Sequence, residues 1–229
     1  MNSFLEKVNI SVSTHLFLKN PNSSDLGQKI ITESINMIYE IGFELFNFKK
    51  LAQKIQTTEA SVYRYFESKH SLLLYLINWY WGMIEYRLIV ESNNISNPKE
   101  RLIRMIHSLT SIPNPENEFV FTQELKLKRV VINESAKAFL TKEVDKENKA
   151  GAFKVYMSII TRVANVIAEV APNYPFPAML VSMLIESSNQ QRFFGEHLPH
   201  LTNTLPDKDA FEDFALDLVN KTLGINGTK

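Results

Sequence analysis

The chain has 229 residues with 25 basic and 25 acidic side chains, so its formal net charge is zero. This balance argues against a protein that binds polyanions over its whole surface, and the 45% hydrophobic content supports a folded core. The absence of cysteine excludes disulfides and thiolate metal sites. The first residues lack the features of a signal peptide, and the most apolar stretch, residues 72–84, is shorter than the roughly 20 residues that cross a bilayer. We therefore expect a soluble cytoplasmic protein with no membrane partner.

Residues 1–24 form a leader with its own pattern. Apolar residues alternate from Val8 to Val12 and again at Leu16 and Leu18, and an Asn-Pro pair follows them. Alternation with a period of two is typical of a strand, and Asn-Pro favours a turn. The leader is therefore predicted to form a short hairpin or an ordered arm.

Helical spacing begins at Asp25. Asp25 and Gln28 resemble a capping box, and Gly42 is suited to end the first helix. Further helices are predicted over 69–91, 98–111, 115–129, 133–147, 151–171, 176–196 and 207–223, with the prolines between helices and at their ends. Since no segment after residue 22 alternates convincingly, the chain is predicted to be all-α.

Two shorter helices are predicted between residues 47 and 70. Asn47 is a favourable N-cap for the first, which we expect to end near residue 55. Thr58 is a favourable N-cap for the second, which we expect to reach about residue 66. Ser68 is placed to cap the long helix that follows.

The same segment has the spacing of a helix-turn-helix. Ala52 is small where the two helices would cross, Gln56 begins the turn, and Val62 would pack the second helix onto the first. Between residues 47 and 70, five basic side chains oppose two acidic ones, a local excess of three positive charges. A basic patch on a neutral protein is typical of a protein that touches DNA with one small face.

A set of positions between residues 28 and 76 agrees in order and spacing with a known family pattern. These positions are Gly42-Phe43, Phe48, Leu51-Ala52, Ser61-Val62-Tyr63-Arg64-Tyr65-Phe66, Ser68-Lys69 and Leu72-Leu73. They resemble the DNA-binding signature of the tetracycline-repressor (TetR) family of bacterial regulators. The resemblance implies a three-helix DNA-binding domain over residues 25–70. It also implies an effector-binding and dimerisation domain over residues 71–229, which matches the family only in kind.

Two substitutions and the long leader depart from the family pattern. Family members usually carry glycine at the position of Gln56, where a helix ends and a positive φ is wanted. A residue other than glycine costs on the order of 1 kcal/mol there. Ala60 replaces the Gly or Pro often found in the first turn of the second helix, which is harmless for helicity.

The resemblance and the helical phase predict the DNA contacts. Tyr63 is expected to lie against the DNA backbone, and Lys69 to form an anion site with the amides that begin the long helix. Arg64 is expected to bind either a guanine or a phosphate, and Tyr65 to be exposed by the same helical phase. The remaining predicted contacts are Lys49, Lys50, Thr58, Glu59 and Ser61. For each residue the alternative is an ordinary structural or solvated side chain.

An effector pocket is predicted in the later helices. Its expected lining is adaptable and apolar: Met83, Met105, Phe153, Tyr156, Met157, Met179 and Met183. Because few ionisable groups fall on these faces, the ligand is expected to be small, largely apolar and at most weakly charged. The alternative is that these residues simply fill a core.

The sequence offers no support for catalysis. It contains no Gly-rich phosphate loop, nucleophile elbow or metalloprotease motif, and its five histidines show no convincing metal-binding spacing. We therefore expect no enzyme activity, metal or cofactor.

The predicted function is a ligand-responsive transcriptional regulator, with repression as the expected mode. It is predicted to bind a palindromic operator as a homodimer, paired through the apolar stripes of its last two helices. The alternative is an α-helical small-molecule-binding or protein-interaction module without DNA binding.

Overall fold

The computed structural model describes residues 10, 12–111, 118–205 and 208–225. Every regular element within these residues is a helix, and the single strand-like feature there is an isolated bridge between Leu205 and Lys208. The predicted all-α class is confirmed. No helix in the described part of the chain is long and apolar enough to span a membrane.

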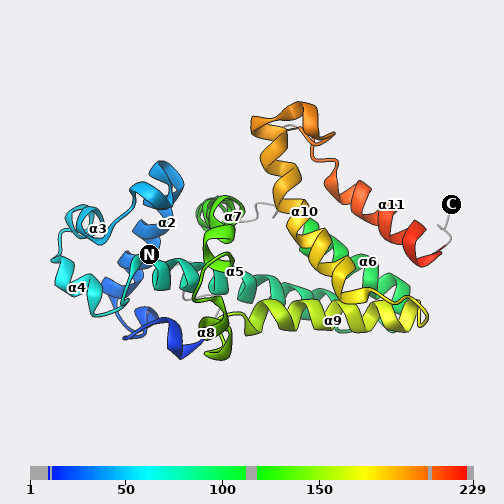
Figure 1. Cartoon of the computed structure of the whole chain (residues 1–229), viewed down its shortest axis with the longest axis horizontal. Helices are drawn as coiled ribbons and strands as arrows, with labels where there is room; N and C mark the ends of the chain where they lie inside the picture. The colour runs from blue at the N-terminus through cyan, green and yellow to red at the C-terminus, as the bar shows by residue number, and fades with distance from the viewer. Residues whose placement is uncertain (1–9, 11, 112–117, 206–207, 226–229) are drawn as a thin grey trace. The chain divides into compact units, whose positions relative to one another are not determined.

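The described elements are all helical (Figure 1). They are η1 (Thr14–Leu16), η2 (Pro21–Ser23), α2 (Asp25–Leu45), α3 (Phe48–Lys54), α4 (Glu59–Tyr63), α5 (Lys69–Ser92), α6 (Pro98–Thr110), α7 (Glu118–Phe139), α8 (Val144–Lys149), α9 (Lys154–Val170), α10 (Pro177–His197), η3 (Pro199–Leu201) and α11 (Phe211–Leu223). The predicted break between residues 129 and 133 is wrong. Helix α7 continues through it because this stretch contains no proline or glycine and buries Val130 and Val131.

Of the two alternatives predicted for the leader, the hairpin is wrong over residues 12–22, while Val8 lies outside the described residues. Two 3-10 turns form instead, and the Asn20 side chain caps the second by accepting from the Asn22 amide at 2.9 Å. The alternating apolar residues Ile10, Val12 and Leu16 are buried. They pack without a partner strand: a Cβ on Gly82 would lie 2.1 Å from Ile10 Cγ2, so glycine makes room for Ile10 against α5.

The cap of α2 differs from the prediction as well. Ser24, one residue before Asp25, is the N-cap, and its hydroxyl accepts from the Gly27 amide at 3.2 Å. Gly27 itself must be glycine, because a Cβ there would lie 2.1 Å from the Pro21 carbonyl oxygen. The leader is thus seated closely on the first turn of α2.

The chain forms two compact units. The first comprises Met1–Met83 and Pro113–Val155, and so holds α2, α3, α4, the first part of α5, α7 and α8. Within it α7 packs along α2. Its core is built from fully buried side chains such as Ile31, Leu51 and Trp79.

The second unit comprises Ile84–Ile112 and Tyr156–Lys229. In it α6, α10 and α11 pack against one another. The buried guanidinium of Arg192 links them: Nη2 donates to Asp209 Oδ2 at 2.6 Å and also to the Thr110 carbonyl, and the group lies over the Phe211 ring. Pairing with Asp209 is what makes a buried cation tolerable there.

Candidate nucleic-acid interface

Helices α3 and α4 form the predicted helix-turn-helix, and both predicted caps are confirmed. The Asn47 side chain accepts from the Lys50 amide at 2.9 Å, and the Thr58 hydroxyl accepts from the Ser61 amide at 3.2 Å. Each cap satisfies an amide that has no partner within its own helix. Helix α4 ends at Tyr63, earlier than the expected residue 66.

The turn between them adopts the backbone that the family pattern requires, without the glycine. Gln56 has φ of 56° and is the one residue other than glycine with positive φ among the described residues. The Thr57 amide donates to the Ala52 carbonyl at 2.9 Å, and the Gln56 amide donates to the Gln53 carbonyl at 3.3 Å. These two bonds make a Schellman motif, which ends α3 and turns the chain toward α4.

Apolar packing beneath the two helices fixes their crossing. Leu51, Ala52 and Val62 are buried at the contact between α3 and α4. Tyr63 extends this packing outward, since its ring meets the Phe48 ring edge-on with centroids 5.0 Å apart. Because 46% of Tyr63 is exposed, the structure holds its ring while leaving the phenol side accessible.

Most of the predicted DNA contacts lie on the surface of these helices. Lys49, Lys50, Thr58, Glu59, Tyr63 and Arg64 are exposed, and Ser61 is partly exposed. Three of these side chains also hold local structure. The Lys50 ammonium donates to the Leu45 carbonyl at 2.8 Å, and the hydroxyls of Thr58 and Ser61 are 2.9 Å apart.

Tyr65 is a correction to the prediction. It is only 3% exposed, because α4 ends before it and the helical phase that would have exposed it no longer applies. Its hydroxyl forms a 2.7 Å hydrogen bond with the Ser24 hydroxyl. This bond, together with the charges of Lys19 and Arg64, lowers the pKa of Tyr65 below its ordinary value, although burial acts in the opposite direction. Tyr65 is therefore buried under the exposed surface of the helix-turn-helix, where it packs against the leader.

Lys69 also lies differently from the expectation. Its ammonium donates to three carbonyls near the end of α2: Phe43 at 3.1 Å, Glu44 at 3.3 Å and Phe46 at 3.4 Å. It also lies 4.6 Å from the centroid of the Phe43 ring. An ammonium has three N–H donors, and all are directed to protein oxygens here. This arrangement favours a structural role for Lys69 over the predicted phosphate contact.

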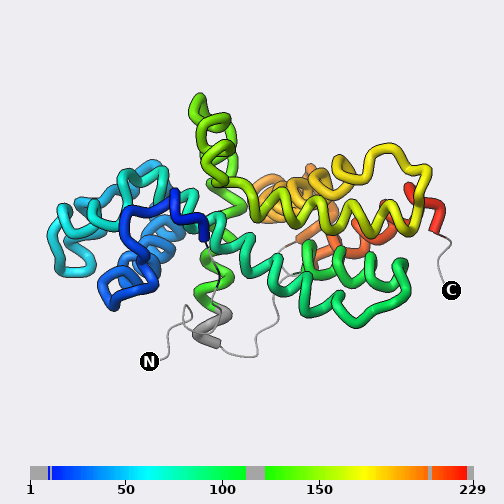
Figure 2. Tube along the Cα trace, turned by 90° about the horizontal axis from the view of Figure 1, so that it is seen from below, coloured from blue at the N-terminus to red at the C-terminus, as the bar shows by residue number. Residues whose placement is uncertain are grey.

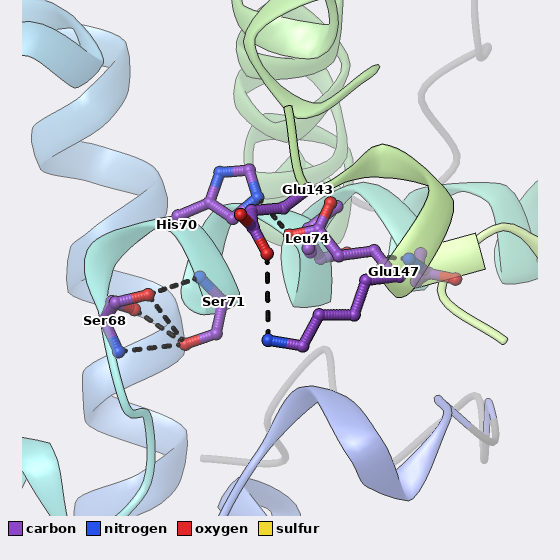
Figure 3. A network of polar contacts seen from close by, with 8 residues as sticks. Ser68, His70, Ser71, Leu74, Glu143 and Glu147 are labelled. Carbon is purple, nitrogen blue, oxygen red and sulfur yellow. Dashed lines mark hydrogen bonds and ion pairs between the residues drawn. The ribbon is translucent and has the colours of Figure 1, made fainter. Parts of the chain in front are cut away.

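At the first turn of α5, the hydroxyls of two serines accept hydrogen bonds from backbone amides (Figure 3). Ser68 and Ser71 cap each other: the Ser71 amide donates to Ser68 Oγ at 3.1 Å, and the Ser68 amide donates to Ser71 Oγ at 3.0 Å. Beside them, His70 Nε2 lies 2.7 Å from Glu147 Oε1 on α8. The predicted cap at Ser68 is thus present, and it uses amides that an anion would otherwise meet.

Sequence reasoning missed Glu134 on α7. Gly42 interrupts α2 with φ of 75° and ψ of 159°, and the buried Glu134 carboxylate accepts from the following amide, that of Phe43, at 3.1 Å. Lys137 pairs with Glu134 at 2.7 Å and with Glu44 at 3.0 Å. Burial acts to lower the pKa of Lys137, but these two hydrogen bonds raise it overall. The one signal in the sequence was a Glu–Lys pair three residues apart.

Three residues of the predicted effector pocket lie on the surface, against the expectation that they line a cavity. Met83, Met105 and Phe153 are buried, and the Tyr156 hydroxyl donates to Glu186 Oε1 at 2.7 Å. Burial raises the pKa of Tyr156 above its ordinary value, and the Glu186 charge adds to this. Three of the seven, Met157, Met179 and Met183, are exposed by 44%, 68% and 45%. These three therefore do not line an enclosed cavity of a single chain, because α9 and α10 bury other faces, around Ile159 and Leu184.

The comparison with known families agrees with the geometry. Residues 30–76 match the sequence model of the bacterial regulatory proteins of the tetR family. The helix-turn-helix segment is therefore similar to the DNA-binding segment of the tetR family. No curated protein matches the sequence significantly.

Solved structures extend the likeness to the fold of the chain. PfmR, a TetR-family transcriptional regulator from Thermus thermophilus, is 15% identical, with 87% of this chain and 99% of that chain covered and a TM-score of 0.58. AibR, solved with isovaleryl coenzyme A and operator DNA, is 16% identical, with 85% and 96% covered and a TM-score of 0.54. A protein described as superantigen PfiT is 16% identical, with 91% and 100% covered and a TM-score of 0.58. The chain thus has the fold of TetR-family regulators over most of its length.

Proposed function

We propose that this chain is a ligand-responsive transcriptional regulator that binds a palindromic operator as a homodimer, with repression as its mode. The observation that carries the proposal is the helix-turn-helix itself. Its turn adopts a left-handed backbone at Gln56, and α4 presents Tyr63 and Arg64 to solvent. An exposed recognition helix beside basic side chains suits the major groove of DNA.

A homodimer follows from the size of this surface. One helix-turn-helix buries too little area for specific binding, so two recognition helices are expected about 34 Å apart on one face of the duplex. Helices α10 and α11 offer a surface for pairing. They expose the large apolar residues Met179, Met183, Phe193 and Phe214. A second copy would cover this face, and light scattering at micromolar concentration is expected to report twice the mass of one chain.

A mobility-shift titration with duplex DNA from upstream of the protein's own gene tests the proposal. Arg64→Ala is expected to weaken binding by about 1–3 kcal/mol, roughly 5- to 150-fold, if Arg64 binds a guanine. Arg162→Ala is the matched control, because Arg162 is an exposed arginine of the second unit. Equal affinities for wild type, Arg64→Ala and Tyr63→Ala would contradict the proposed recognition surface.

The alternative is a helical binding module that has the same fold and no DNA partner. PfiT supports this alternative, because it is described as a superantigen and has a similar fold, with a TM-score of 0.58. If the dimeric protein binds no upstream duplex at any salt concentration, this alternative takes the place of the regulator.

For the effector we propose a small molecule, as in two proteins of similar structure. AibR was solved with isovaleryl coenzyme A, and a putative regulator from Saccharomonospora viridis was solved with choline. Within the second unit, the buried Met105 supports an apolar ligand, while Tyr156 and Glu186 add one polar pair. A ligand acts only through different affinities for the DNA-bound and DNA-free forms. Screening small apolar metabolites for release of bound operator DNA tests this part.

A further inference from the structure

The leader forms hydrogen bonds with Tyr65, the residue that follows Arg64. The Leu18 amide donates to the Tyr65 carbonyl at 2.8 Å, and the Ser24 hydroxyl bonds to the Tyr65 hydroxyl at 2.7 Å. Phe17 meets the Tyr75 ring of α5 edge-on at 6.0 Å, and Figure 2 shows the leader running beside the start of α5. The leader is therefore seated at the end of the recognition helix. It lies outside residues 30–76, which carry the family match.

These contacts place Lys19 over the ring of Tyr65, the residue that follows Arg64. The Lys19 ammonium lies 5.0 Å from the centroid of the Tyr65 ring, and its side chain is exposed. The hydrogen bond with Ser24 lowers the pKa of Tyr65 most, burial acts against it, and Lys19 and the charge of Arg64 lower it further, so two cations from separate segments act on one phenol. Two like charges held near each other repel, and a shared anion would relieve that repulsion.

We propose that Lys19 binds a DNA phosphate when α4 lies in the major groove, so that the leader extends the DNA-binding surface beyond the helix-turn-helix. The inference rests on the proposed function. The backbone phosphates of a duplex flank the groove in which a recognition helix lies, whatever the base sequence. A lysine on a docked segment neutralises one of them without adding any preference for sequence.

Salt dependence of DNA binding separates this contact from simple packing. For Lys19→Met, which keeps the length of the side chain and removes its charge, affinity is expected to fall on operator and unrelated duplex alike. The slope of log affinity against log salt is expected to decrease by about 0.9, the value for one phosphate. Lys19→Arg is expected to restore the slope. Lys142→Met, at an exposed lysine of the same unit, is the matched control and is expected to match wild type.

The outcomes distinguish this inference from the proposed function. If wild type binds no duplex DNA, both fail together. If Arg64→Ala weakens binding while Lys19→Met keeps the wild-type affinity and slope, only the role of Lys19 is overturned. Tyr65→Phe removes the hydrogen bond to Ser24 and leaves both cations in place. If Lys19→Arg fails to restore the slope while Tyr65→Phe lowers it, the loss comes from the packing of the leader and the phosphate contact is overturned.

Discussion

Near the recognition surface, a residue with positive φ interrupts α2 and another ends α3. The two residues differ in type and in the groups that hydrogen-bond to the backbone beside them. Gly42 interrupts α2 at φ of 75° and ψ of 159°, while Gln56 ends α3 at φ of 56°. The angles of Gly42 belong to a region that is essentially restricted to glycine. The φ of Gln56 matches the left-handed helical region, which other residues enter at a modest cost. One position therefore requires glycine, and the other only prefers it.

The partners of the two ends differ as well. The backbone around Gln56 is satisfied by its own neighbours, through the bonds of Gln56 and Thr57 to the carbonyls of α3. The backbone after Gly42 is satisfied from far along the chain, by the Glu134 carboxylate and the Lys69 ammonium. A local turn folds with its helix, whereas the end of α2 depends on the packing of α7 and α5. The four predictions that follow test this difference.

Replacing Glu134 is expected to have the largest effect. Glu134→Leu removes the acceptor of the buried Phe43 amide and a partner of Lys137. Losing one member of a buried polar group costs about 3 kcal/mol of unfolding free energy. Denaturant titration measures the change, and Glu143→Leu, at an exposed pair with Lys146, is expected to stay within about 0.5 kcal/mol of wild type. Equal costs for the two variants would mean that α7 does not hold the end of α2.

Substituting Gly42 is expected to come next. A Cβ there would find space, since the one atom near it is Glu134 Oε1 at 3.9 Å. The cost of Gly42→Ala is therefore one of backbone conformation and is expected to be about 2 kcal/mol. Thermal or denaturant unfolding tests it. A stability equal to wild type would show that α2 ends without the positive φ.

Gln56→Gly is expected to change stability in the opposite direction, by less. Glycine removes the cost of the left-handed conformation, about 1–2 kcal/mol. It also makes the unfolded chain more flexible, which offsets part of this gain in stability. The expected net gain is about 0.5–1 kcal/mol of unfolding free energy, with DNA affinity unchanged because the turn keeps its shape. Gln56→Ala keeps the left-handed cost and is expected to show no such gain.

The pair between Glu44 and Lys137 is expected to give the smallest effect. The hydrogen bond from Lys137 lowers the pKa of Glu44 from its ordinary value of 4.5. A carboxylate whose pKa is lower in the folded state contributes stability above its unfolded pKa and loses it as the pH falls through its folded pKa. The stability difference between wild type and Glu44→Gln should thus be small at neutral pH, begin to fall near pH 4.5 and vanish at a lower pH, where Glu44 is protonated in the folded state as well. A difference that grows in acid would contradict this sign.

Local chemistry explains which sequence predictions succeeded. Asn47 and Thr58 cap α3 and α4 as predicted, because a cap is decided by a side chain and an amide two or three residues away. The need for a positive φ at Gln56 was also visible, through the resemblance to a family that usually carries glycine there. The length of α4 was not predicted correctly, and the exposure of Tyr65 was therefore wrong too. Tyr65 bonds to Ser24, 41 residues earlier in the chain, and the sequence near α4 does not indicate that contact.

The sequence by itself determined that the chain is helical, that residues 47–70 form a helix-turn-helix, and that α4 presents Tyr63 and Arg64. Spacing and capping within a few residues carry that information. Only the tertiary structure decided that Lys69 donates to the carbonyls at the end of α2, that Glu134 accepts from the Phe43 amide, and that Lys19 lies over the Tyr65 ring. These roles depend on groups brought together from distant parts of the chain. The hydrogen bonds and charges involved act over a few ångströms, and no pattern of neighbours in sequence encodes such distances.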